Sequence, residues 1–98
     1  MRILLSPIVS EWSKVEYEFD GEIIKAVYTD IPSGETYEDT FDFTGMPDGR
    51  LESVESDLPK DVILSAEKKN GVLSVELVNY IGFDATDEEK YPSWQEVN

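Results

Sequence analysis

Hydrophobic and polar residues alternate along much of the chain, which is the pattern of β-strands with one buried face. Val15, Tyr17 and Phe19 share one face of an extended segment, and charged residues stand between them. Asp20-Gly21 follows at once, and this pair is typical of type I′ turns because both residues tolerate positive φ. The pattern predicts a hairpin whose return strand covers residues 22–29.

A third strand is predicted after a second turn. Residues 31–34 (IPSG) combine a proline, which fixes φ, with a glycine, which adds backbone freedom. Residues 36–43 then alternate again, with Tyr37, Phe41 and Phe43 on the apolar face. Asp39 falls on that same face, where burial without a partner is costly, so we expect it at the margin of the sheet.

A second hairpin is predicted in residues 62–81. Val62, Leu64 and Ala66 alternate with other residues as one face of a strand that ends at residues 69–71 (KNG). Asn-Gly is a strong hairpin signal, so residues 72–81 should form the paired strand. In that strand Leu73, Val75 and Leu77 should point inward.

Three further elements are indicated by shorter signals. Residues 3–9 predict a first strand, in which Pro7 favours an edge position or a bulge. Residues 51–58 carry apolar side chains at helical spacing and predict a helix of two turns before Pro59. Residues 86–89 (TDEE) form a capping-box pattern and predict a short helix that Pro92 ends.

These elements predict a mainly β fold with one or two short helices. About six strands, mostly joined by tight turns, favour an antiparallel sheet that folds on itself as a small sandwich or barrel. The chain of 98 residues is expected to be one β domain, residues 1–98. Residues 83–98 should pack on this domain or extend from it.

The charge of the chain changes the picture of its surface. Asp and Glu number 22 against 8 Lys and Arg, which gives a formal net charge of −14. Such a surface repels nucleic acid and anionic membranes, and it favours cationic partners or simple solubility. The apolar start ends at Ser6 and is too short for a secretory signal, so we expect a cytoplasmic protein.

The residue types that carry most chemistry near neutral pH are missing. The chain has no His and no Cys, so we expect no catalytic residues, no cofactor and no enzyme activity. Ser65 and Lys68 would point to opposite faces of a strand and cannot act together. The acids at 84–89 fit the start of a helix better than a metal site, although a divalent cation there stays open.

Three aromatic residues lie outside the alternating strands and are the candidate site residues. Trp12 is in the connection after the first strand, and Tyr91 and Trp94 lie near the C-terminus. Tyr and Trp are enriched at interface hot spots, which favours contact with a partner. The alternative is a lid, in which the C-terminal segment lays these rings over an open end of the core.

Four stretches of the chain carry a resemblance to a known group of proteins. They are residues 41–49 (FDFTGMPDG), 63–68 (ILSAEK), 70–77 (NGVLSVEL) and 91–96 (YPSWQE). In this order they resemble small acidic proteins encoded among the tail and tail-fibre genes of phages and prophages of Gram-positive bacteria. The likeness covers most of residues 15–96, and these motifs mark turns and strands.

The resemblance implies a non-enzymatic structural or accessory protein, with a place in tail assembly. Its partner would be a phage tail component or a second copy of the chain. It would reside in the host cytoplasm or be incorporated in the virion. A second hypothesis follows from charge: alternating acids such as Glu16 and Glu18, or Glu38 and Asp42, favour a DNA mimic that inhibits a host nucleic-acid-binding protein.

Overall fold

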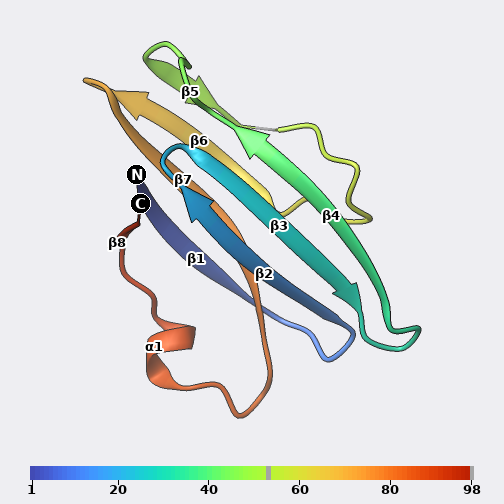
Figure 1. Ribbon diagram of the computed structural model, residues 1–98. Helices are drawn as coiled ribbons and strands as arrows, with labels where there is room; N and C mark the ends of the chain where they lie inside the picture. The colour runs from blue at the N-terminus through green and yellow to red at the C-terminus, as the bar shows by residue number, and fades with distance from the viewer. Residues whose placement is uncertain (53, 98) are drawn as a thin grey trace.

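The computed structural model describes residues 1–52 and 54–97, which form two β-sheets and one short helix (Figure 1). The five-stranded sheet has the order β5-β6-β7-β1-β8, with the bounds β1 Arg2–Val9, β5 Gly49–Leu51, β6 Ile63–Lys69, β7 Val72–Ile81 and β8 Gln95–Glu96. The three-stranded sheet has the order β2-β3-β4, with the bounds β2 Ser13–Asp20, β3 Ile23–Asp30 and β4 Glu35–Asp42. Helix α1, Asp87–Lys90, lies between β7 and β8.

The two sheets lie in two layers and share one core (Figure 1). The largest side chains that are fully buried are Ile24 from β3, Val62, and four residues of β7, namely Leu73, Val75, Leu77 and Val78. Burial of each such side chain contributes about 1.5–3 kcal/mol. The mainly β fold is confirmed, as an open two-sheet arrangement. It is not a barrel, because both strand orders end at free edges.

The first hairpin forms as predicted, but its turn differs. Asp20 pairs with Ile23, so the two turn residues are Gly21 and Glu22. Gly21 has φ of 60°. Glu22 does not have positive φ, because Asn70 is the one non-glycine residue with positive φ among the described residues. Glycine with positive φ at the first turn position alone is typical of a type II′ turn, so the predicted type I′ turn at Asp20-Gly21 is wrong.

The second hairpin has the predicted turn. Lys69 pairs with Val72, and the two residues between them, Asn70 and Gly71, have φ of 52° and 78°. Positive φ at both positions is the geometry of a type I′ turn. Leu73 and the two alternate residues after it are buried, as predicted.

A β-bulge in β6 overturns the predicted inward position of Leu64. The pairing of β6 with β7 shifts between Ile63 and Ser65. The extra residue at this point turns Leu64 outward, where it is exposed, while Val62, Ile63 and Ala66 are buried. Simple alternation cannot predict this change of face, because it assumes two residues per repeat throughout.

The pairing of β1 with β7 is parallel, which the sequence pattern does not predict. Ile3 lies beside Val75 and Leu5 beside Leu77, so apolar residues of both strands share a face. Tight turns predict pairing between neighbours in sequence, whereas this pair encloses most of the chain. At Pro7 the strand β1 is paired on one side, with β7, because β8 on the other side pairs with Arg2 and Ile3.

The two predicted helices have different outcomes. Residues 86–90 contain the predicted capping box: the Glu89 N–H donates to Thr86 Oγ1 at 3.3 Å, and the Thr86 N–H donates to a Glu89 carboxylate oxygen at 3.2 Å. The predicted helix over residues 51–58 is wrong. Leu51 ends β5 and residues 54–60 are not helical, while residue 53 lies outside the described residues.

Glycine at the second hairpin turn should be required for full stability. A Cβ at Gly71 would meet nothing within 4 Å, so any cost of substitution comes from its φ of 78°. Gly71→Val should lower the free energy of unfolding by about 1–2 kcal/mol, whereas Gly71→Asn should cost less because Asn tolerates positive φ. Urea unfolding measures both variants, and equal stability of Gly71→Val and the parent chain would contradict the turn geometry.

Candidate functional site

The predicted site residue Trp12 lies at one end of the two sheets, in the connection between β1 and β2. Its side chain is 66% exposed. Its backbone is held on both sides: the Trp12 N–H donates to Ser10 Oγ at 3.2 Å, and its carbonyl accepts the Ile31 N–H at 3.0 Å. The strand that follows begins at Ser13, whose buried hydroxyl lies 2.7 Å from the Tyr28 hydroxyl. These bonds fix the backbone from which an exposed ring projects.

Phe83 joins Trp12 at this end of the molecule. Val9 and Ile81 pair at the ends of β1 and β7, so the residues that follow both strands emerge side by side. Phe83 is 77% exposed, and together with Val9 and Trp12 it lines a shallow hollow of about 180 Å³. Ile31 is exposed opposite Trp12. We call Val9, Trp12, Ile31 and Phe83 the end patch.

Phe83 is not among the predicted site residues, although the sequence contains a signal for it. Phe83 follows Gly82, just after the last predicted strand, where no alternation assigns it an inward face. An aromatic residue outside the alternating strands was the criterion that selected Trp12. The same criterion would have selected Phe83.

The other two predicted site residues lie far from Trp12. The Trp94 ring packs over the Arg2 guanidinium, with 5.2 Å between the guanidinium carbon and the ring centroid. Arg2 begins β1 and Trp12 follows its end, so about 23 Å of strand separates the two places. Tyr91 is 78% exposed and Trp94 is 43% exposed. The three predicted residues therefore do not form one surface. In the C-terminal segment, the residue that packs against the core is Val97.

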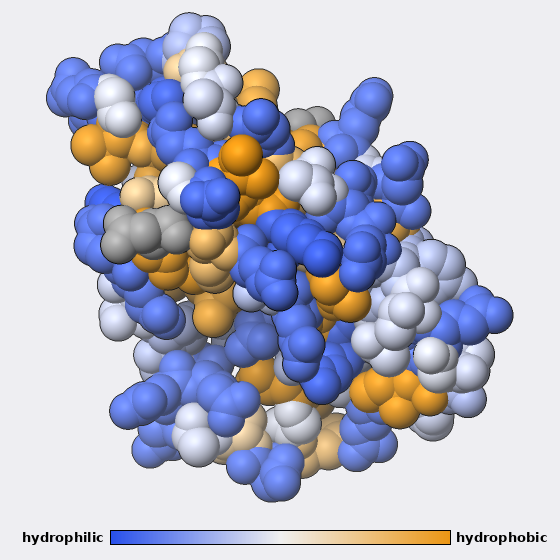
Figure 2. All heavy atoms as spheres, viewed as in Figure 1, coloured by the Kyte–Doolittle hydropathy of each residue, from blue (hydrophilic) through white to orange (hydrophobic). Residues whose placement is uncertain are grey.

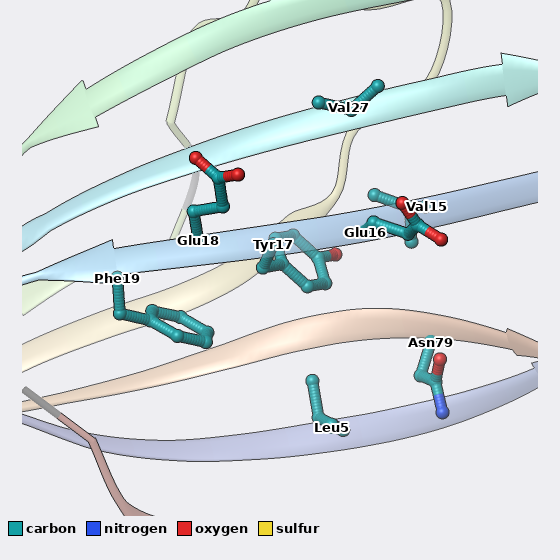
Figure 3. A pocket seen from close by; sticks show the side chains of 8 residues that line it. All are labelled: Leu5, Val15, Glu16, Tyr17, Glu18, Phe19, Val27 and Asn79. Atoms are coloured by element: carbon teal, nitrogen blue, oxygen red, sulfur yellow. The ribbon is translucent and has the colours of Figure 1, made fainter.

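A groove of about 480 Å³ follows the free edge of β2, and Figure 3 shows the side chains that line it. Tyr17 and Phe19 point from β2 toward Leu5 of β1, while Glu18 points to the other side of the strand (Figure 3). The Tyr17 hydroxyl donates to the Val78 carbonyl at 2.5 Å, which ties β2 to the five-stranded sheet. Burial of this phenol raises the pKa of Tyr17, because the charged form loses its hydration.

The backbone of β2 has one bonded edge and one open edge. Asp20 and Ile23 flank the two-residue turn, and the Trp12 carbonyl accepts the Ile31 N–H. Backbone groups of successive residues point alternately to opposite edges of a strand, so the even-numbered residues of β2 bond to β3. The N–H and C=O groups of Val15, Tyr17 and Phe19 therefore point to the open edge, beside the groove.

The surface around these features is strongly acidic. Figure 2 shows hydrophilic residues over most of one face, with smaller hydrophobic areas between them. On the outer side of β2, the Lys14 ammonium lies 3.0 Å from a Glu16 carboxylate oxygen, and Glu18 lies opposite Lys25 of β3. Both acids are exposed, so the groove is bordered by carboxylates in contact with solvent.

Acidic residues in two parts of the chain have structural roles, because their carboxylates accept backbone N–H groups. Glu89, in the predicted acidic segment, accepts the Thr86 N–H in the capping box. Asp39 lies half-buried on the edge strand β4, as expected, and its two carboxylate oxygens accept the N–H groups of Thr40 and Asp57 at 2.8 and 2.9 Å. Within residues 1–52 and 54–97 no group of three or more acids is arranged to hold a metal ion.

We found no match to this chain among protein-family models, curated proteins or solved structures. No helix in the described part of the chain is long and apolar enough to cross a membrane. The features of the molecule that bear on function are the end patch, the groove and the charge.

Loss of the Tyr17 hydroxyl should weaken the contact between the sheets. Tyr17→Phe leaves the Val78 carbonyl without this donor and should lower the free energy of unfolding by about 1–2 kcal/mol at neutral pH. Tyr91→Phe, which removes a hydroxyl from an exposed ring, is the matched control and should have no effect.

The same contact should be sensitive to alkaline pH. The folded pKa of Tyr17 lies above its ordinary value of 10.0. Its contribution is therefore complete below about pH 10 and is lost as pH rises toward the folded pKa, because the unfolded phenol ionises first. The difference in unfolding free energy between the parent chain and Tyr17→Phe should shrink above about pH 10. A constant difference up to about pH 12 would contradict the burial of this hydroxyl.

Proposed function

We propose that this chain is a non-enzymatic protein-binding module, a structural or accessory part that acts through contacts with another protein. The end patch is the observation that carries the proposal. Trp12 and Phe83 are large, exposed and adjacent, and their backbone positions are set by the ends of paired strands. Aromatic residues held in this way on a polar surface are typical of interface hot spots.

The charge of the chain favours a different protein as the partner over a second copy. Two copies of a chain with net charge −14 repel each other, and this repulsion is strongest at low ionic strength. A partner with a basic surface would instead be attracted and would associate faster. The same acidic surface disfavours nucleic acid and anionic membranes as partners.

The resemblance to proteins of phage tail modules supports a partner among tail components. Under this proposal the chain acts in tail assembly in the host cytoplasm, and it either remains in the virion or leaves after assembly. Such a role needs no catalytic residue, because contact surfaces and strand edges perform it.

A DNA mimic is the second candidate, and one feature of the three-stranded sheet favours it. Its outer face carries Glu16 and Glu18 on β2 and Glu38 on β4, and alternate residues on a strand lie about 6.7 Å apart. However, Lys14 pairs with Glu16, and Lys25 lies 3.7 Å from Glu38. These lysines interrupt the rows of negative charge that a mimic needs, so we place it second.

Removal of the end patch should abolish binding to the partner. In co-expression with the tail gene cluster, a tagged chain should co-purify with tails or their intermediates. The double variant Trp12→Ser/Phe83→Ser should lower recovery by at least about tenfold, since hot-spot aromatic residues each contribute about 2 kcal/mol or more. Both side chains are exposed, so the melting temperature should hardly change.

Val72→Thr is the matched control for this experiment. Val72 is exposed at the other end of β7, so this variant should bind like the parent chain. If the chain never migrates with tails, the tail role is wrong. If it binds a host DNA-binding protein in a salt-sensitive way and the double variant binds equally well, the DNA mimic replaces the first proposal.

A further inference from the structure

Among residues 1–52 and 54–97, the strands β1, β4 and β2 each have a long side without a paired strand, and on the first two this side is partly obstructed. One stretch is the side of β1 beyond Ile3, where β8 has ended. The Val97 N–H donates to the Met1 carbonyl, so the odd-numbered residues of β1 direct their backbone groups to this side. Pro7 is one of them and lacks an N–H. The C-terminal segment also lies across this edge, because Thr86 and Pro92 line a hollow with Leu5.

The second stretch is the outer edge of β4, where one backbone donor is occupied and a neighbouring segment is bonded to the strand. Phe43 donates its N–H to the Glu22 carbonyl, so the even-numbered residues of β4 point outward. The Thr40 N–H on this edge donates to Asp39 Oδ1, and Asp39 Oδ2 accepts the Asp57 N–H from the adjoining segment. A new strand that pairs along the whole of this edge would have to break the bond of the Thr40 N–H and displace the segment that contains Asp57.

The third stretch is β2, and its edge is open. Within residues 1–52 and 54–97, the N–H groups of Val15, Tyr17 and Phe19 have no hydrogen bond to a side chain or to another segment. They lie beside the groove of about 480 Å³, into which an adjacent strand could place alternate side chains. Natural proteins normally cover such an edge, and an uncovered one binds extended segments.

We propose that β2 is a docking edge for an extended, cationic segment of a partner protein, which would add to the three-stranded sheet as a fourth strand. This inference rests on the proposed function and names the chemistry of the partner. Apolar residues of the segment would enter the groove against Tyr17 and Leu5. The residues between them would lie beside Glu16 and Glu18, so Lys or Arg is favoured there.

Charge argues against a second copy as the occupant. Pairings centred on Val15 or Glu16 place Lys14 of one copy opposite Glu16 or Glu18 of the other, so it is the net charge of −14 on each copy that opposes them. A two-fold antiparallel pairing centred on Tyr17 places Glu16 of each copy opposite Glu18 of the other, and one centred on Glu18 places that acid opposite itself. Like charges directly opposite each other destabilise a strand pair. A segment with alternating basic residues replaces this repulsion by attraction.

A synthetic peptide of four Lys-Val repeats, at concentrations where it is monomeric alone, tests the proposal on the full chain. Binding should slow amide hydrogen exchange of Val15, Tyr17 and Phe19 by about tenfold or more, because these donors gain partners. The amides of Thr36 and Glu38 on the β4 edge should not change. A peptide with four Lys followed by four Val has the same charge without the alternation and should give no protection.

Two charge-reversal variants locate the site. Glu16→Lys/Glu18→Lys should weaken peptide binding by about tenfold or more, whereas Glu38→Lys/Asp42→Lys should leave it within about twofold. Both double variants change the net charge equally, and both alter exposed acids on the outer face of the same sheet. Equal weakening by the two variants would mean general charge attraction and would overturn the proposal.

The remaining outcomes are also decisive. Protection of the β2 amides without peptide, increasing with protein concentration, would identify a second copy as the occupant and overturn the proposal. Peptide binding without protection of these amides would overturn it as well. If the peptide fails while Trp12→Ser/Phe83→Ser still abolishes recovery with tails, the inference about β2 is wrong and the proposed function stands.

Discussion

An open β-sheet leaves a row of backbone N–H and C=O groups at each edge, and the structure of this chain depends on how those rows are satisfied. A barrel would have removed the edges, but here two separate sheets face each other. Pro7 and the C-terminal segment block one stretch, and on another Asp39 accepts one edge donor, the Thr40 N–H, and holds the neighbouring segment through the Asp57 N–H. The edge of β2 remains, beside a groove.

The contact between the sheets places this edge and the end patch on a rigid base. Tyr17 contributes in two ways: its backbone groups point to the open edge, and its hydroxyl bonds to the Val78 carbonyl of the facing sheet. At the turn after β2, the ammonium of Lys68 lies 3.1 Å from a Glu22 carboxylate oxygen and connects β6 to the first hairpin. Since both side chains are largely shielded from water, this pair is screened less by salt than the surface pairs.

Local sequence patterns predicted the local parts of the fold. Alternation and the Asn70-Gly71 turn gave the second hairpin, and the capping box gave α1, because these signals act over a few residues. Pairing between distant segments was not predicted, above all the parallel pairing of β1 with β7. Of the candidate site, Trp12 could be selected from sequence, but its proximity to Phe83 depends on that parallel pairing. The open edge of β2 also required the strand order.

Amide hydrogen exchange of the free protein at residue resolution tests the central claim most directly. If β2 is an edge strand whose odd-numbered residues direct their backbone groups to the open edge, the amides of Val15, Tyr17 and Phe19 should exchange much faster than those of Glu16, Glu18 and Asp20, which bond to β3. Uniform protection along β2 in dilute solution would contradict the account, because both edges of the strand would then be paired.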